Sequence, residues 1–241
     1  MAAGVDAMTS NEDDPEVNQL WAAMAADDKA ALRPFLIRRY LPQGDVVTRT
    51  GHDVETVYLP TTADLANVVR FTDGRSGMGS NVGREGVTGL AAFLANEPCG
   101  WDVEVQVAGH AWALPAARLR HRVHESPPLL QLLMTLTHNN QIEAAQNAVC
   151  NALHMVTPRL ARWLLTIQDR TGRSDFDLTQ EDLATIMSVR RTTVNASWQE
   201  LGRMGGIKAR RGVVKIVSRE PLERACCQCY GELRRRMANL G

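Results

Sequence analysis

The sequence lacks the features that mark membrane, secreted and disulfide-rich proteins. No apolar run approaches the roughly 20 residues of a membrane span. The first thirty residues are acidic and lack the basic start and apolar run of a signal peptide. The 5 cysteines are an odd number without the spacing of a disulfide framework, which predicts reduced thiols. We therefore expect a cytoplasmic protein that does not bind a membrane.

Motifs of the common catalytic classes are also missing. The chain contains no HExxH, no GxSxG and no P-loop, and no Cys/His or paired-carboxylate constellation stands out. The sequence therefore predicts a protein that is not an enzyme and that carries no cofactor.

Cysteines and histidines do not form an obvious metal site. No cysteine precedes Cys99, so an N-terminal iron–sulfur cluster is not expected. On one helix Cys226 and Cys229 would share a face, while Cys227 would point about 100° away. Packing of a C-terminal helix is the preferred interpretation, and metal or redox sensing is the alternative. His121 and His124, three residues apart, are interpreted as a polar helix end rather than a metal pair.

Net charge is zero over the whole chain, but it is divided unevenly. Residues 1–125 contain 11 Lys and Arg against 17 Asp and Glu, a net charge of −6. Residues 126–241 contain 16 against 10, a net charge of +6. An acidic half joined to a basic half is expected when only one domain meets a polyanion.

Residues 177–201 predict two short helices joined by a tight turn. Thr179 is the expected N-cap of the first helix, and Asp182, three residues later, gives an Asp variant of the capping box. The turn is expected at residues 187–189. The apolar face of this first helix consists of Leu183, Ala184 and Ile186.

The second helix of this pair is expected to begin at Arg190. An i, i+4, i+7 spacing turns Val194, Trp198 and Leu201 inward. This leaves polar donors on the outer face near the N-terminal end, where a recognition helix meets base edges in a major groove. An ordinary solvated helix surface is the alternative. The outward residues are Arg190, Arg191, Thr192 and Asn195.

A basic β-hairpin is predicted after this helix. Gly205 and Gly206 end the helix, and residues 207–216 form two short strands around an Arg-Arg-Gly turn. The pattern predicts a winged helix whose wing cations contact phosphates. The candidate DNA-binding residues are Thr179, Gln180, Arg190, Arg191, Thr192, Thr193, Asn195, Arg210, Arg211 and Lys215.

The N-terminal half has a different texture. Residues 1 to about 15 are expected to be disordered, and residues 15–40 carry a helical pattern. From residue 41 to about 123, short apolar runs broken by turn residues favour an antiparallel sandwich or barrel. Val103, Val105 and Val107 should share one face of a strand.

A long helix is predicted from Pro127 or Pro128 to His154. Its apolar stripe approaches coiled-coil spacing, which favours packing against a second copy over an intramolecular core helix. Another helix is expected from Thr157-Pro158 to Gly172. The candidate dimerisation residues are Leu129, Leu132, Leu133, Leu136, Ile142 and Val149.

The 241 residues suffice for two domains with a connector. The predicted fold is α+β, with four segments. They are a tail and helix (1–34), an antiparallel β-roll sensor domain (35–126), a dimerisation helix (127–156) and a winged helix-turn-helix domain (157–241).

This order of parts resembles the cyclic-AMP receptor protein/FNR (Crp/Fnr) family of bacterial transcription regulators. The resemblance is strongest in TQEDLATIMSVRRTTV (179–194), and extends to VYLP (57–60), GREGVTGL (83–90) and VQVAGHAWALPAARL (105–119). It implies a cyclic-nucleotide-binding-like jelly roll, a homodimer and a palindromic double-stranded DNA operator. RNA polymerase is a further candidate partner.

The resemblance also implies which residues read bases. The family's base-reading positions fall on Arg191, Thr192 and Ala196. Arg191 keeps the guanidinium that the family directs at a guanine, whose O6 and N7 an arginine can bind together. Thr192 and Ala196 replace longer polar side chains, so the operator sequence stays open.

The sensor half departs from the family pattern for cyclic-nucleotide binding. Glu85 matches an early Glu of the phosphate loop, but the later Arg-Ser or Arg-Thr pair falls near Asp102, whose carboxylate would repel a phosphate. Gly83, Gly86 and Gly89 are interpreted as turn glycines rather than a phosphate cradle. We therefore expect a regulator that does not respond to cyclic nucleotides, with Glu85 and Asp102 in an effector pocket whose ligand is unknown. The alternative is a ligand- or partner-binding β-roll whose winged helix mediates protein contacts.

Overall fold

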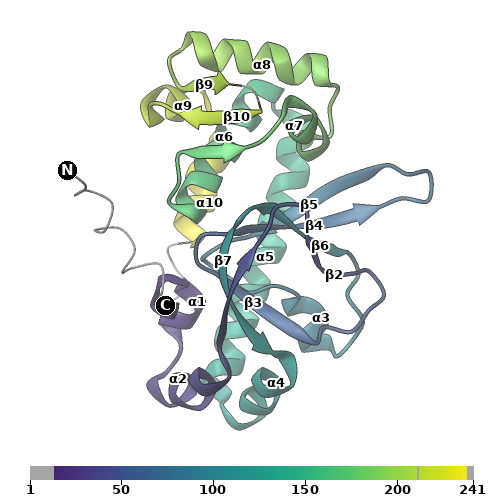
Figure 1. Cartoon of the computed structure of the whole chain (residues 1–241), viewed down its shortest axis with the longest axis vertical. Coiled ribbons are helices and arrows are strands. Elements are labelled where there is room, and N and C mark those ends of the chain that lie inside the picture. The colour runs from purple at the N-terminus through teal and green to yellow at the C-terminus, as the bar shows by residue number, and fades with distance from the viewer. Residues whose placement is uncertain (1–13, 211, 238–241) are drawn as a thin grey trace, which may run out of the picture.

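The computed structural model describes residues 14–210 and 212–237. A β-rich part and a C-terminal helical part lie one above the other in Figure 1, and the long helix α5 (Pro127–Leu153) runs behind both. Each part has its own core of buried apolar residues. The predicted α+β arrangement of β-roll, long helix and helix-turn-helix is confirmed.

Two antiparallel sheets form the β-roll. One has the order β1-β7-β3 and the other the order β2-β6-β4-β5. Buried and half-buried residues alternate along β6, with Val103, Val105 and Val107 inside as predicted. The strands are β1 (Ile37–Leu41), β2 (Val46–Thr48), β3 (Thr56–Pro60), β4 (Asp64–Arg70), β5 (Ser76–Val82), β6 (Asp102–Val107) and β7 (Gly109–Pro115).

Short helices surround the β-roll. The helical pattern predicted for residues 15–40 appears in its first part as α1 (Gln19–Ala23) and α2 (Ala26–Leu32), with 3-10 turns at Pro15–Val17 and Arg33–Phe35. The strand texture predicted up to residue 123 is wrong in two places, which form α3 (Leu90–Ala95) and α4 (Ala116–Glu125).

The α3 segment, LAAFLA, is short and apolar, and such a run suits a buried strand or a buried helix equally well. In α4, Leu119 and Val123 lie four residues apart and both are buried, which is the spacing of one helix face. Most of the disorder predicted for residues 1–15 falls outside the described residues.

Helix α5 buries one of its faces against the β-roll. Ser126 caps it, since its hydroxyl accepts a hydrogen bond from the Leu129 backbone N–H at 3.3 Å. Leu129, Leu133 and Leu136 belong to the β-roll core and are at most 1% exposed. Their assignment to a dimer contact is therefore wrong, because a second copy cannot reach side chains that the same chain already covers.

Another set of apolar side chains on α5 remains uncovered. Leu132 packs partly against the β-roll core and Ile142 is half-buried, but Val149 is 52% exposed. These uncovered residues, which we call the open stripe of α5, are Leu130, Met134, Val149 and Leu153, between 39% and 74% exposed.

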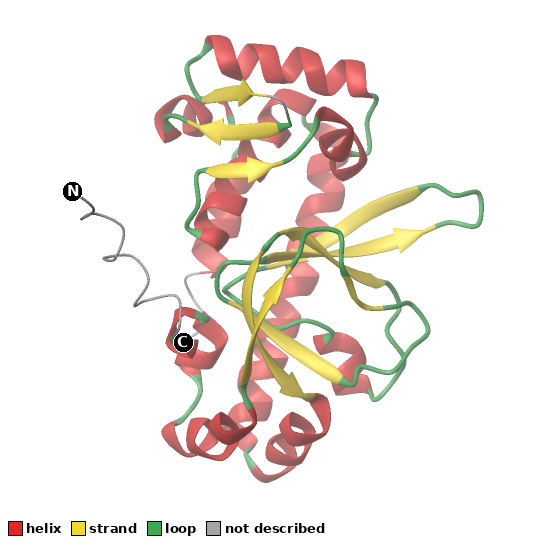
Figure 2. Ribbon diagram, viewed as in Figure 1, coloured by secondary structure: helices red, strands yellow, loops and turns green. Residues whose placement is uncertain are grey.

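The C-terminal part combines five helices with a small sheet of order β8-β10-β9 (Figure 2). Strand β8 was not predicted, because three residues are too few to show the alternation of apolar and polar side chains that marks a strand. The elements are α6 (Val156–Thr171), β8 (Asp175–Asp177), α7 (Gln180–Met187), α8 (Arg191–Arg203), β9 (Ile207–Arg210), β10 (Val213–Ile216), α9 (Arg219–Ala225) and α10 (Cys229–Met237). Among the described helices, none combines the length and apolar character that crossing a bilayer requires.

Candidate nucleic-acid interface and ligand cavity

Helix α7 begins with the predicted capping box. The Thr179 hydroxyl accepts from the Asp182 backbone N–H at 3.1 Å, and the Asp182 carboxylate accepts from the Thr179 N–H at 2.7 Å. The helix ends at Ser188, whose φ of 53° turns the chain into the left-handed region. These two ends fix the short turn that directs α8.

Helix α8 presents a polar N-terminal end to solvent. Val194, Trp198 and Leu201 are buried in the C-terminal core as predicted, whereas Arg191, at the start of the helix, is exposed. Arg190 and Arg191 form no ion pair within the described part of the chain, so both guanidiniums remain available to a ligand. The other exposed residues at this end are Thr192, Thr193 and Ala196.

Two of the candidate residues contact each other rather than solvent alone. Gln180 of α7 donates from its amide to the Asn195 Oδ1 of α8 at 3.1 Å. This bond joins the two helices across the same surface that carries Arg191. Gln180 and Asn195 therefore orient the surface as well as contributing polar groups to it.

The predicted hairpin is present as β9 and β10, with Val213 opposite Arg210. Lys215 is exposed on β10. The backbone of Arg210 ends β9, and Arg211 lies outside the described residues. The hairpin thus carries an exposed cation, Lys215, in the same part of the chain as α8, which is the arrangement expected of a wing.

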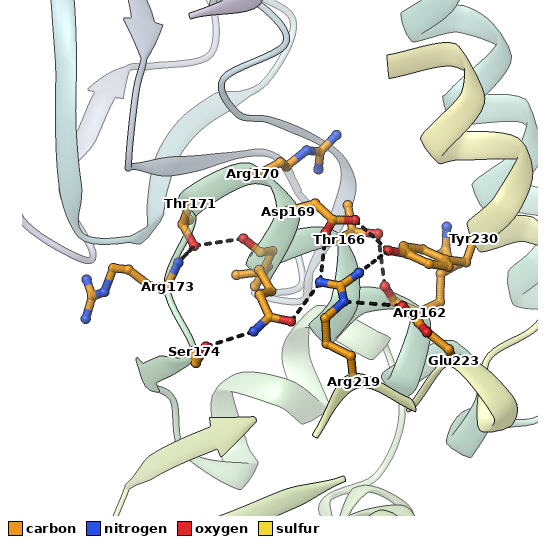
Figure 3. A network of polar contacts seen from close by, with 12 residues as sticks. Arg162, Thr166, Asp169, Arg170, Thr171, Arg173, Ser174, Arg219, Glu223 and Tyr230 are labelled. Carbon is orange, nitrogen blue, oxygen red and sulfur yellow. Dashed lines mark hydrogen bonds and ion pairs between the residues drawn. The ribbon is translucent and has the colours of Figure 1, made fainter. Parts of the chain in front are cut away.

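A polar network fixes the segment after the wing to α6 (Figure 3). Arg219 donates to Asp169 at 2.8 Å and to the Tyr230 hydroxyl at 2.6 Å, and that hydroxyl donates to Asp169 at 2.6 Å. Burial, together with the Asp169 carboxylate, raises the pKa of Tyr230 to about 12, so the phenol keeps its proton. The network joins α9 and α10 to α6, the helix against which α8 packs.

A cavity of about 450 Å³ lies between the β4–β5 hairpin and α5. Its walls include Asn67 and Val69 of β4, Trp101, and Asn140 and Glu143 of α5. None of the described lining residues is a Lys, an Arg or a His. The cavity therefore suits a largely apolar ligand whose polar groups form hydrogen bonds with the Asn side chains, and suits an anion less well.

Neither of the predicted effector residues, Glu85 and Asp102, lines this cavity, and an effector pocket at these two residues stays a prediction. Asp102 accepts from Arg70 at 2.8 Å and from the Thr50 backbone at 2.8 Å, which lowers the pKa of Asp102 although its burial works against this. Glu85 pairs with Arg170 of α6 at 2.8 Å. Both carboxylates already have internal cations.

Arg170 lies at the junction of the two parts of the chain. Besides Glu85, its guanidinium meets Glu143 of α5 at 3.1 Å and Asp64 of β4 at 3.7 Å. Burial raises the pKa of Asp64 to about 7, against the opposing effect of Arg170, and also raises that of Glu143. Three buried carboxylates thus share one cation, which we call the Arg170 junction.

At two of the three glycines in the 83–90 segment, local geometry explains why the residue is glycine, without any need for a ligand. A Cβ on Gly83 would lie 2.5 Å from the Arg170 side chain, so only glycine lets the junction close. Gly89 has a φ of 67°, a left-handed conformation that disfavours other residues. The interpretation as turn glycines agrees with this geometry.

The sequence analysis missed one group of residues. Helix α9 ends at Ala225 and α10 begins at Cys229, so the single helix assumed for Cys226–Cys229 is wrong. The break places Cys227 and Cys229 beside Cys150 and His154 of the α5 end. The i, i+4 spacing of Cys150 and His154 was the available signal, since it puts both on one helix face.

Comparisons with known proteins agree with this geometry. Residues 158–225 match the model of the Crp-like helix-turn-helix domain. The chain has the Crp/Fnr fold. The first similar structure is a protein from Eubacterium rectale assigned to the Crp/Fnr family of transcriptional regulators, with a TM-score of 0.65 and 17% identity over 87% of this chain and 98% of that one.

Two further structures share the Crp/Fnr fold at low identity. FixK2 from Bradyrhizobium japonicum has a TM-score of 0.65 and 15% identity, covering 80% of this chain and 98% of its own. The c-di-GMP responsive global regulator CLP from Xanthomonas campestris has a TM-score of 0.62 and 16% identity, covering 80% and 100%. No curated protein sequence matches the chain significantly.

Proposed function

We propose that this chain is a homodimeric, sequence-specific DNA-binding transcription regulator of the cytoplasm, without enzymatic activity. The observation that carries the proposal is the exposed N-terminal end of α8, where Arg190 and Arg191 have no internal acidic partner in the described part of the chain. Arginines held at this end of a recognition helix are placed to reach base edges. Lys215 on the wing supplies a phosphate contact.

Dimerisation is proposed through the open stripe of α5. Val149 and Leu153 remain 52% and 74% exposed at the end of the helix near the DNA-binding domain, and Met134 is 54% exposed further along. A matching helix from a second copy would cover all of them, and a two-fold axis between the helices pairs the two recognition helices. The proposal thus moves the contact to a face of α5 that includes Val149 but excludes Leu133.

The cavity between the β4–β5 hairpin and α5 argues against cyclic nucleotides as effectors. A cyclic phosphate needs a cation or a set of backbone donors, and the lining contributes Glu143 as its charged group. Glu143 already binds Arg170 of α6. A neutral ligand in the cavity would touch this residue and thereby act on the Arg170 junction. We propose that a neutral ligand in this cavity regulates the protein, or that no ligand regulates it.

Base reading by Arg191 is tested by selecting binding sites from random DNA. Arg191→Ala should cost about 1 to 3 kcal/mol on the best operator and relax the preference at one base pair of each half-site. Arg203→Ala is a matched control, because Arg203 is an exposed arginine in the last turn of the same helix. An unaltered selected sequence in Arg191→Ala would show that α8 does not read bases through this residue.

Operator symmetry gives a second test. A two-fold dimer should protect a palindrome with half-site centres about 34 Å apart, one turn of DNA. Footprinting and sedimentation on the same sample measure both quantities. A monomer that binds one half-site with full affinity would contradict the proposal.

A further inference from the structure

A group of sulfur and nitrogen atoms gathers where α5 meets the C-terminal segment. Cys150 lies in the last turn of α5 and His154 is the C-cap of that helix. Cys227 lies between α9 and α10, and Cys229 begins α10. The four possible ligand atoms all lie within 4.8 Å of one another.

The group is shielded from solvent and separate from both cores. Cys150, Cys227 and Cys229 are 0%, 7% and 1% exposed, and among the described residues they form a small buried cluster of their own. His154 is half-buried at its edge. A free cysteine often packs as a small apolar residue, so the feature that distinguishes this group is that three thiols and an imidazole bring their possible ligand atoms to one point.

The separations of the atoms match a mononuclear tetrahedral centre. Metal–sulfur bonds of about 2.3 Å and metal–nitrogen bonds of about 2.0 Å give tetrahedral edges of about 3.8 Å between sulfurs and about 3.5 Å between sulfur and nitrogen. The Sγ atoms of Cys150 and Cys227 are 3.6 Å apart. His154 Nδ1 lies 3.4 Å from the Cys150 Sγ and 3.7 Å from the Cys229 Sγ.

The surroundings supply the outer partners that a thiolate centre needs. Gln146, one turn before Cys150 on α5, donates from its Nε2 to the Cys229 Sγ at 3.0 Å. Burial raises the pKa of the Cys150 and Cys227 thiols, and the positive charge of Arg162 on α6 opposes that rise. Three thiolates, one imidazole and a divalent cation carry a net charge of −1, which a neighbouring guanidinium offsets.

We propose that Cys150, His154, Cys227 and Cys229 bind one Zn²⁺, which fastens the start of α10 to the end of α5. Three thiolates and an imidazole are a ligand set of structural zinc sites, all four positions being filled by protein. A polynuclear iron–sulfur cluster would divide the four ligands among two or more irons and would space some of them more widely than this. Cys226 is outside the site, because its thiol donates to the Glu223 carbonyl.

Metal content of the full-length protein, purified with reductant and without chelator, is the first test. Elemental analysis should find one zinc per chain. Cys227→Ser and Cys229→Ser should reduce this to nearly zero. Cys226→Ser and Cys99→Ser are matched controls, and both should keep one zinc.

A measurement on the wild-type protein guards against variants that fail to fold. X-ray absorption at the zinc edge should show three sulfur neighbours and one nitrogen. Co²⁺ added to the metal-depleted, reduced protein should give the thiolate charge-transfer absorption and intense visible bands of a tetrahedral site. Gln146→Ala should weaken zinc binding about 10-fold or more in competition with a chelator, because a hydrogen bond to a ligand tunes affinity.

Three results would overturn the proposal. One is reduced, folded protein that takes up neither Zn²⁺ nor Co²⁺. Another is stoichiometric zinc that persists in folded Cys227→Ser and Cys229→Ser, or that shows an oxygen-dominated shell. The third is a Cys150–Cys227 disulfide in freshly isolated protein, detected by mass spectrometry without reduction.

Discussion

The proposed DNA-binding surface and the Arg170 junction use arginine in opposite ways. Arg190 and Arg191 are exposed on α8. Arg170 lies on α6, two helices before α8, and is buried and paired with Glu85, Glu143 and Asp64. A charge left in solvent can exchange water for a ligand, whereas a charge paired in the interior mainly fixes geometry. The location of the counter-ions therefore separates residues that recognise from residues that connect.

Adjacent residues on α5 give the sharpest test of which surfaces are free. Leu133 is fully buried in the β-roll core and Met134 is 54% exposed. Leu133→Asp should lower the free energy of unfolding by about 4 kcal/mol or more, because it places a carboxylate among apolar side chains. Chemical denaturation followed by circular dichroism measures this loss.

Met134→Asp should instead leave the fold intact and separate the two copies. Loss of the second half-site should then weaken operator binding by about 100-fold or more. Sedimentation and gel-shift titration measure the two effects. A dimeric Met134→Asp with wild-type affinity would place the dimer contact elsewhere.

The Arg170 junction should make stability depend on pH. Asp64 has a pKa of about 7 when folded, against an ordinary value of 3.8. Because folding favours the protonated form, its contribution is fully present below pH 4 and is lost as pH rises towards 7. The loss amounts to up to about 4 kcal/mol.

Asp64→Asn should flatten this part of the pH profile of the unfolding free energy. Asp73→Asn is the control, because Asp73 is an acid in the exposed β4–β5 turn that pairs with Arg75. A profile identical in wild type and Asp64→Asn would show that Asp64 ionises normally inside the fold. The pKa of this buried carboxyl would then resemble that of an exposed one, and the contrast between the two regions would be smaller than the geometry indicates.

The capping box of α7 gives a smaller effect. Thr179→Ala should cost about 1 kcal/mol, since the first turn loses the acceptor for the Asp182 N–H. Thr185→Ala, in the middle of the same helix, should be neutral or slightly stabilising, because this hydroxyl donates to the Glu181 carbonyl one turn back. Thermal melts of the two variants should therefore differ in direction or size.

The wing should show the smallest and least selective effect. Lys215→Ala should weaken binding to specific and random DNA alike and reduce the slope of log affinity against log salt by about 0.9. Titrations at several salt concentrations measure that slope. A loss confined to one operator position would assign Lys215 to base reading instead of phosphate contact.

The elements that sequence could predict are those whose signals are local. The Thr179 cap, the inward positions of α8 and the length of α5 each depend on residues within a few turns of one another. The pairing of Glu85 with Arg170 and of Cys150 with Cys227 joins residues 85 and 77 positions apart, which no short pattern encodes. Leu129, Leu133 and Leu136 were likewise misassigned, because α5 is apolar on two faces and only the packing of the β-roll decides which of them it covers.

The Arg170 junction also determines where this chain can be cut. Arg170 belongs to α6, but it pairs with Asp64 and Glu85 of the β-roll segment and with Glu143 of α5. A fragment ending at His154 would keep these three carboxylates in its interior and lose their guanidinium. We expect such an isolated sensor to fold only in acid, and an expression boundary placed after Gly172 to rescue it.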